Sequence, residues 1–231
     1  MQKIKNLLIY SMMKITSNIY QIGGSGLSDP SDAAVYLLTS NNEAALIDSG
    51  TGKNVNRLIE NIKSAGVNLQ GIKYLFLTHC HFDHTGGAQK IRELTGCSIV
   101  AHELDAVYIE KGDSETTAAS WYGTVMAPVK IEIKVKGNSK DFNVGGVDLH
   151  FYHTPGHSPG SSVITAKSDG LTVLFGQDVH GPLDNALRSN LQDYKASLAF
   201  LLTLEADILC EGHFGVFKGK QKVNKFIESY L

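Results

Sequence analysis

Apolar and polar positions alternate along the chain with two different periods, which predict short strands and amphipathic helices. In the first half, a series of strand-like runs gives way to a rhythm in which strands and helices alternate. The predicted strands of this half are 18–22, 33–39, 44–48, 72–77 and 97–101, and the predicted helices are 55–65, 86–95 and 102–111. This succession of elements indicates an α/β domain.

A second series of apolar runs follows residue 128. The predicted strands are 129–135, 147–153, 161–165, 171–175 and 207–210, and the predicted helices are 191–204 and 219–231. We expect the runs at 129–135 and 147–153 to open a second sheet. Apolar residues share one face of 147–153, which leaves His150 on the solvent side.

Length and charge narrow the class of protein. The chain has 231 residues, enough for one α/β domain with a large core, so we treat residues 1–231 as a single domain. Its 21 basic and 23 acidic residues give a net charge of −2, which offers no electrostatic argument for binding nucleic acid or a membrane. We therefore expect a small-molecule partner, and formation of a homodimer stays open.

Cysteine usage and the N-terminal residues favour a cytoplasmic location. The three scattered cysteines are too few for a disulfide framework, and an odd number fits a reducing compartment. The apolar patch at residues 7–10 is too short to span a bilayer and lacks a cleavage site of small residues. We expect residues 1–13 to form a mobile extension, and translation from Met12 or Met13 is an alternative.

The most informative stretch follows the predicted strand 72–77. Three histidines and an aspartate occur there within six positions, followed by a glycine pair. Imidazole and carboxylate groups suit a divalent cation such as zinc, and a cation relieves the crowding of polar groups at a buried strand end. The alternate residues His79 and His81 can point to one side. Asp83 and His84 then reach a second position nearby, so the spacing indicates two metal ions.

The run His79-Cys80-His81-Phe82-Asp83-His84 resembles the HxHxDH motif of the metallo-β-lactamase superfamily, and in particular its binuclear hydrolase branch, which includes glyoxalase II and acyl-homoserine lactonases. Three later segments resemble further motifs of the family: residues 153–161 (HTPGHSPGS), 175–178 (FGQD) and 211–215 (EGHFG). Gln177 stands where the family usually has glycine, so this loop departs from the pattern. The resemblance implies an αββα sandwich of two mixed β-sheets with helices on the outer faces.

The resemblance also implies two divalent metal ions, with zinc as the first expectation and iron or manganese as alternatives. The implied ligands are His79, His81 and His157 for the first ion and Asp83, His84 and His213 for the second, with Asp178 bridging the two. Such a pair lowers the pKa of a shared water toward neutrality and polarises the carbonyl under attack. Asp83 is the implied catalytic residue, which orients the metal-bound hydroxide and passes its proton to the leaving group.

Two functions from different classes fit these residues. The first is a metal-dependent hydrolase that cleaves an ester, thioester or lactone. The alternative is a mononuclear iron persulfide dioxygenase, which resembles the same scaffold and would use His79, His157 and Asp178. The complete set of ligands for a second ion favours hydrolysis.

Several residues outside the ligand motifs are candidates for supporting roles. Asp48 ends the third predicted strand, and we expect it to orient a ligand histidine from beneath the metal ions, with a plain turn as the alternative. His102 is expected to lie on the surface or to cap the helix that follows it. His153 is a weaker candidate for supporting the metal ligands.

Substrate contacts are expected from residues that lie between the motifs. The irregular segment 112–128 is a candidate flap, in which Trp121 and Tyr122 would line a pocket or, alternatively, fill the core or a dimer contact. His180 follows the bridging aspartate closely enough to reach the same pocket. Tyr194 begins a predicted helix, where its hydroxyl would either meet a substrate carbonyl or be buried.

Overall fold

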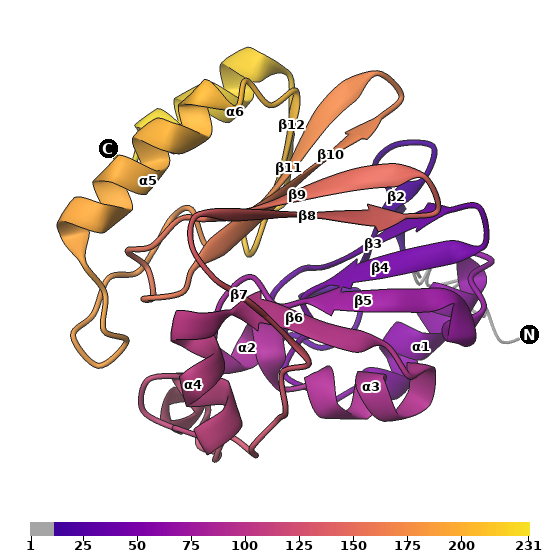
Figure 1. Cartoon of the computed structure of the whole chain (residues 1–231), viewed down its shortest axis with the longest axis horizontal. Helices are drawn as coiled ribbons and strands as arrows, with labels where there is room; N and C mark the ends of the chain where they lie inside the picture. Colours follow the sequence, from indigo (N-terminus) through magenta and orange to yellow (C-terminus); the bar gives the residue numbers. More distant parts are fainter. Residues whose placement is uncertain (1–11) are drawn as a thin grey trace, which may run out of the picture.

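Two β-sheets face each other at the centre of the molecule, and helices cover their outer sides (Figure 1). The computed structural model describes residues 12–231. The first sheet has seven strands in the order β1-β2-β3-β4-β5-β6-β7, and the second has six in the order β13-β12-β11-β10-β9-β8. This arrangement is the αββα sandwich that the motifs implied, so the predicted fold is confirmed.

The chain builds the first sheet from its N-terminal half. Its strands are β1 (Met13–Lys14), β2 (Ile19–Gly23), β3 (Val35–Ser40), β4 (Glu43–Ile47), β5 (Ile72–Phe76), β6 (Ser98–His102) and β7 (Ile133–Val135). The helices of this half are α1 (Val55–Ser64), η1 (Leu69–Gly71), α2 (Phe82–Thr85), α3 (Ala88–Thr95), α4 (Glu103–Lys111) and η2 (Ala119–Tyr122).

The second sheet comes from the C-terminal half. Its strands are β8 (Ser139–Val144), β9 (Val147–His153), β10 (Ser162–Ser168), β11 (Leu171–Gln177), β12 (Ile208–Glu211) and β13 (Val216–Lys218). Helices α5 (Leu191–Thr203) and α6 (Lys220–Glu228) pack against its outer side (Figure 1). Helix α5 begins where the Asn190 side chain accepts hydrogen bonds from two backbone N–H groups of its first turn.

Strand residues of the first sheet alternate between two hydrophobic cores. Leu37 and Leu75 belong to the core under the helices of the first half. Their neighbours Leu38 and Phe76 point to the opposite side, where they meet Phe175 and other residues of the second sheet. Strands β4 to β7 are parallel, and β4 and β6 are buried on both faces, which explains why these two central strands are largely apolar.

The strand prediction for residues 129–135 was wrong, and strands β8 and β13 were not predicted. Only Ile133–Val135 of the predicted strand 129–135 is extended, and it pairs in parallel with β6 in the first sheet, so it does not open the second sheet. The sequence also gave no sign of β8 or β13. Both are edge strands, and most positions of β8 are exposed and polar, so neither has the apolar alternation by which a strand is recognised.

Three histidines that are not predicted metal ligands have defined positions. The His102 side chain accepts a hydrogen bond from the Leu104 backbone N–H and caps α4, as predicted, but it is buried, so the surface alternative is wrong. The ring of His153 stacks on it with centroids 3.7 Å apart. His150 lies on the solvent side of β9, as predicted, and its Nδ1 is 2.7 Å from a carboxylate oxygen of Asp141.

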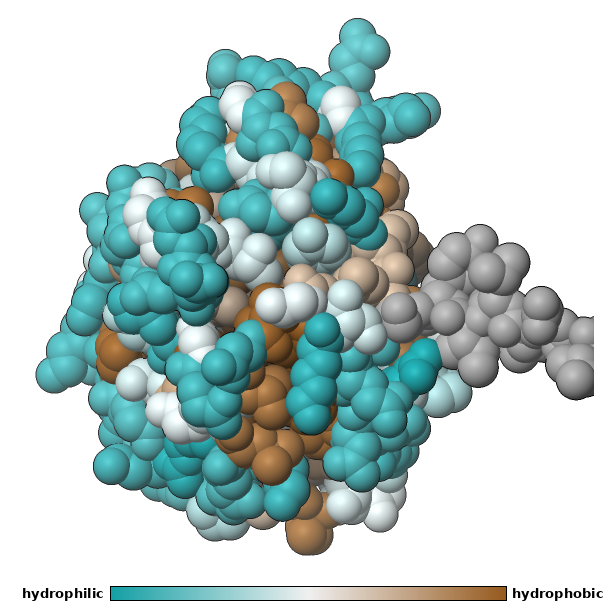
Figure 2. Space-filling model, turned by 90° about the vertical axis from the view of Figure 1, so that its right-hand side faces the viewer, coloured by the Kyte–Doolittle hydropathy of each residue, from teal (hydrophilic) through white to brown (hydrophobic). Residues whose placement is uncertain are grey.

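The N-terminal strand and the surface complete the description. The predicted mobile extension falls outside the described residues except for Met12 and Met13, and Met13 pairs with Gln21 in the first sheet. Within residues 12–231, no helix is long and apolar enough to cross a membrane. On the face shown in Figure 2, hydrophilic side chains surround a hollow in which hydrophobic residues are exposed.

Removing the Phe76 ring tests the core between the sheets. Phe76 is fully buried, and its ring centroid lies 4.9 Å from that of Phe142 on the opposite sheet. We expect Phe76→Ala to lower the free energy of unfolding by about 3–5 kcal/mol, because it leaves a cavity between the layers. Leu171→Ala, at a position that is 39% exposed, is the matched control in urea unfolding. Equal losses in the two variants would contradict this packing.

Candidate metal centre

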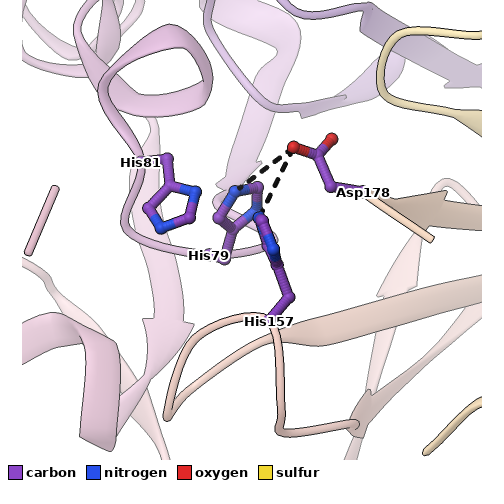
Figure 3. Close-up of side chains that lie close together, drawn as sticks. All are labelled: His79, His81, His157 and Asp178. Atoms are coloured by element: carbon purple, nitrogen blue, oxygen red, sulfur yellow. Dashed lines mark ion pairs between the residues drawn. The ribbon is translucent and has the colours of Figure 1, made fainter. Parts of the chain in front are cut away.

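Four side chains from three loops converge where strands of both sheets end (Figure 3). His79 and His81 follow β5, His157 lies between β9 and β10, and Asp178 follows β11. One ligating atom from each of the four lies within 4.8 Å of those of the others. The imidazole rings of His81 and His157 have centroids 4.5 Å apart. The structure thus brings together all the residues that the motifs implied for the first metal ion, together with the implied bridging residue.

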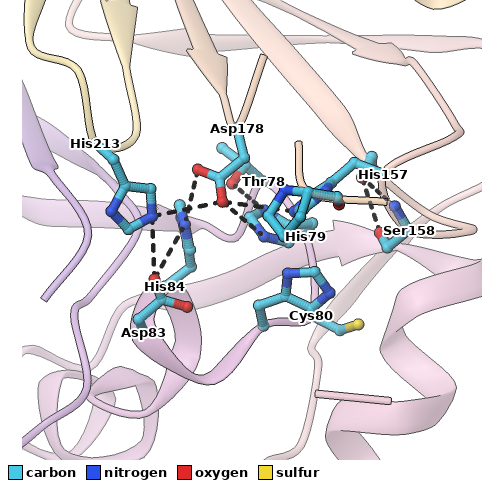
Figure 4. Close-up of polar contacts among 12 residues, drawn as sticks. Thr78, His79, Cys80, Asp83, His84, His157, Ser158, Asp178 and His213 are labelled. Atoms are coloured by element: carbon cyan, nitrogen blue, oxygen red, sulfur yellow. Dashed lines mark hydrogen bonds and ion pairs between the residues drawn. The ribbon is translucent and has the colours of Figure 1, made fainter. Parts of the chain in front are cut away.

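A second group lies beside the first and shares Asp178 with it (Figure 4). Asp83, His84 and His213 place ligating atoms within 4.8 Å of one another. Asp178 Oδ1 is 3.2 Å from His84 Nε2, and its Oδ2 is 3.4 Å from His213 Nε2 and 3.5 Å from His157 Nε2. Asp178 therefore lies between the two groups, as a bridging ligand must.

Local backbone structure explains this placement. His81 precedes α2, a single helical turn whose first residues include Asp83 and His84, so the chain turns directly from one group to the other. Gly212 permits the close approach of the His213 loop, because a Cβ atom there would lie 2.1 Å from Asp178 Oδ1. Substituting Gly212 would therefore displace the bridging carboxylate.

The buried ligating atoms fit two divalent cations. The Nε2 atoms of His79, His81, His84 and His157 and the Oδ1 atom of Asp178 are buried and accept or donate no hydrogen bond within the described part of the chain. A buried polar atom without a partner costs about 1–3 kcal/mol, so a concentration of them requires an explanation. Imidazole nitrogen and carboxylate oxygen are ligands of zinc and related ions, which would satisfy these atoms.

The electrostatic environment differs between the groups. Burial and the neighbouring histidines lower the pKa of His79 and His81 well below the usual value, so both rings are neutral with a free lone pair for a cation. Burial also opposes a charge on His84, but the carboxylates of Asp178 and Asp48 outweigh it and raise the pKa of His84 well above its usual value. The second group thus attracts positive charge strongly.

Asp48 supports the centre from beneath, in the position that the sequence led us to expect. Its Oδ1 accepts a hydrogen bond of 2.8 Å from the Thr78 backbone N–H. This contact holds the start of the metal loop, the segment after β5 that carries His79 and His81. Its Oδ2 is 2.7 Å from His84 Nδ1, so this nitrogen carries the proton and His84 Nε2 faces the group of ligands. His157 is oriented in the same way by the backbone carbonyl of Pro182, which is 2.8 Å from its Nδ1.

Sequence reasoning missed Asp105, a fully buried residue of α4. Its carboxylate accepts hydrogen bonds from Cys80 N at 2.8 Å, Gly160 N at 2.6 Å and Ser158 Oγ at 2.5 Å. These contacts join the loop of the first two histidines to the loop of His157. In the sequence Asp105 is one of three acidic residues on the same helix, with Glu103 and Glu110, so no local pattern identified it.

Sequence reasoning also missed Glu211, which is fully buried at the end of β12. One of its oxygens accepts hydrogen bonds from the backbone N–H groups of His213 and Phe214, at 2.6 and 2.7 Å. The other is 2.7 Å from Nδ1 of His180. Glu211 therefore positions a predicted metal ligand and a predicted substrate contact together.

A cavity of about 250 Å³ opens over the metal centre. Its lining residues are His81, Asp83, Ala118, Trp121, Tyr122, Asp178, His180, Pro182, Leu187 and His213. Three of the four predicted substrate contacts are thus among the lining residues. Tyr194 is not, since it is buried at the start of α5 and its hydroxyl donates a hydrogen bond to the backbone carbonyl of Val179. This placement matches the burial alternative for Tyr194.

The family of this chain follows from comparison with known proteins. The metallo-beta-lactamase superfamily matches residues 28–213. The chain is 30% identical over 154 residues to the probable metallo-hydrolase MJ0888 of Methanocaldococcus jannaschii, covering 67% of this chain and 70% of that protein. It is 25% identical over 228 residues to the acyl-coenzyme A thioesterase MBLAC2 of Gallus gallus, covering 86% of this chain and 78% of that protein.

Solved structures agree at the level of the fold. BJP-1, a subclass B3 metallo-beta-lactamase of Bradyrhizobium japonicum, is similar with a TM-score of 0.79 and 24% identity, covering 96% of this chain and 90% of that one. The chain therefore belongs to the metallo-β-lactamase superfamily, as its motifs indicated. Its paired buried His/Asp clusters are those of a metal-dependent hydrolase with room for two metal ions.

Truncating His81 tests the first group of ligands. We expect His81→Ala to abolish turnover and to lower the metal content by about one ion per chain, because the group loses one of its few ligands. The fold should be retained in circular dichroism. His150→Ala, which removes an exposed histidine from β9, is the matched control and should keep both metal and activity. Undiminished turnover of metal-loaded His81→Ala would contradict the site.

Changing Asp48 tests the support beneath the second group. We expect Asp48→Asn to weaken binding of one metal ion by about 10–100-fold. The neutral amide lacks the negative charge of the carboxylate that accepts the hydrogen bond from His84 Nδ1, so it orients this ligand less strongly. Titration with a chromophoric chelator measures this change. Asp141→Asn, which alters the partner of the exposed His150, controls for the general effect of losing a carboxylate. Unchanged affinity in Asp48→Asn would leave Asp48 with a turn-forming role only.

Proposed function

We propose that this protein hydrolyses an ester, thioester or lactone with the help of two divalent metal ions, zinc being the first expectation. The single observation that supports this proposal is the complete second group, Asp83, His84 and His213, held next to the first by Asp178. A mononuclear dioxygenase on this scaffold needs only three of the ligands. The burial of His84 and Asp83 in a second, fully assembled group favours the binuclear reaction.

Bound metal ions would supply a water of lowered pKa and a polarised carbonyl. The chain's own contribution begins with Asp83, whose carboxylate lines the cavity and lies 3.1 Å from His213 Nε2 through its Oδ2. Burial opposes its charge, but His84 and His213 outweigh burial and lower the pKa of Asp83, so the carboxylate is ionised at neutral pH. It is therefore able to accept a proton from water and to pass it to the leaving group.

Two further side chains face the reacting groups from the cavity wall. Burial raises the pKa of the Tyr122 hydroxyl, and the negative charge of Asp83 adds to this effect, so the phenol stays protonated and is available as a hydrogen-bond donor. His180, which also lines the cavity, is held by Glu211, which accepts a hydrogen bond from its Nδ1 and leaves Nε2 free. We assign both residues to the binding of substrate.

One relative in particular supports an acyl compound as the substrate. The Gallus gallus protein to which this chain is 25% identical bears the name of an acyl-coenzyme A thioesterase. Thioesters, esters and lactones share an acyl carbon that water attacks, and the cavity offers space over the ligands for such a group. We therefore place the substrate among acyl esters, thioesters and lactones.

Metal content decides between the two reactions. We expect elemental analysis of protein purified without added metal or chelator to give about two divalent ions per chain, and chelation to abolish hydrolysis of p-nitrophenyl acetate. Restoring zinc, manganese or iron(II) separately identifies the effective ion. Activity is measured against the His81→Ala variant to exclude hydrolysis by contaminants. About one iron per chain, with oxygen uptake on addition of a persulfide, would replace the hydrolase by the dioxygenase.

A further inference from the structure

We infer that the cavity selects substrates whose acyl part is uncharged and apolar, an inference that rests on the proposed hydrolysis. The cavity has a polar floor and an apolar wall. Metal ligands form the floor, Tyr122 and His180 add polar atoms next to them, and the rest of the wall consists of the apolar residues Ala118, Trp121, Pro182 and Leu187. With the acyl carbon placed over the ligands, the rest of the acyl group lies against this wall.

In the described part of the chain, the wall has no cationic side chain that could pair with a carboxylate on the acyl group. None of the described residues that line the cavity is lysine or arginine. Arg188 follows the wall residue Leu187, but its Nε is 3.3 Å from Thr116 Oγ1 and its guanidinium lies over the ring of Tyr108, 5.3 Å from the centroid. An acyl group that ends in a carboxylate would thus lose its hydration without gaining a cationic partner.

The free energy of burial also favours an uncharged acyl group over a charged one at this wall. Apolar surface gains about 25 cal/mol per Å² when it is removed from water, whereas a buried charge without a partner is strongly unfavourable. The half-exposed indole of Trp121 offers apolar surface to an acyl group, and the buried side chains of Ala118 and Leu187 beside the cavity carry no charge that could pair with a carboxylate. Discrimination against a charged acyl group therefore follows from the wall itself.

The wall is attached directly to the metal ligands. The segment that carries Trp121 is joined to the metal loop where the Phe82 N–H donates to the Thr117 carbonyl at 2.7 Å. The segment that carries Leu187 is joined where His157 Nδ1 meets the Pro182 carbonyl at 2.8 Å. Because the wall and the ligands are linked by hydrogen bonds, the cavity is formed before substrate arrives.

Binding is measured through Trp121, which is the only tryptophan of the chain. Its fluorescence reports occupancy of the cavity whether or not any reaction occurs. We expect hexanamide to shift the emission of the metal-loaded protein to shorter wavelength with saturation, and acetamide, which lacks the apolar chain, to have no effect at the same concentrations. Absence of any change with hexanamide would overturn the inference.

Selectivity is measured by kcat/KM for two esters of equal chain length. We expect p-nitrophenyl hexanoate to be preferred over mono-p-nitrophenyl adipate, which ends in a carboxylate, by at least about tenfold. Equal or better turnover of the adipate would overturn the inference and leave the hydrolase intact. Binding of hexanamide without hydrolysis of any ester would retain the apolar cavity and reject the proposed hydrolase.

A charge introduced at the wall should reverse part of this preference. We expect Trp121→Arg to raise kcat/KM for the adipate relative to the hexanoate by about threefold to fivefold, as a partly exposed ion pair allows. Val125→Arg adds the same charge on the same segment, at a position that is 75% exposed and does not line the cavity. It should leave the ratio unchanged, and an equal rise in both variants would contradict selection at the wall.

Discussion

The burial of several imidazoles and carboxylates at the meeting point of the two sheets is the constraint on which this structure depends. Asp178 lies within about 4 Å of four histidine nitrogens, and many of these polar atoms have no hydrogen-bond partner within the described residues. In an apolar core such a cluster would oppose folding. Divalent cations would reverse this effect, because each ion would satisfy several of these atoms at once, so metal binding would be coupled to the stability of the site.

Three buried carboxylates outside the ligand set hold the ligand loops in place. Asp48 links the start of the first loop to His84, Asp105 links that loop to the His157 loop, and Glu211 fixes the loop of His213. Each accepts backbone N–H groups, which a charged oxygen binds more strongly than a neutral one does. The geometry of the metal ligands is therefore determined largely by backbone atoms, which keep their positions when surface side chains change.

The same hydrogen bonds connect the chemistry to the cavity above it. The loop between β11 and α5 orients His157 through Pro182 and also contributes Leu187 to the wall. The segment between α4 and β7 contacts the metal loop through Thr117 and presents Trp121 and Tyr122. These two segments are irregular, so they can differ in substrate contacts without altering the sheets that position the metal ions.

The sequence by itself indicated an α/β domain and, through the resemblance of its motifs to those of a known family, the sandwich fold and the ligands, because such motifs are local features of the chain. The spacing of apolar residues along the chain also located most strands and helices. Only the tertiary structure decided that β7 joins the first sheet, that Asp105 and Glu211 hold the loops, and that Tyr194 is buried away from the cavity. These features depend on contacts between residues far apart in the chain. Asp105, for example, meets Gly160 across 55 positions, and no local pattern records such a contact.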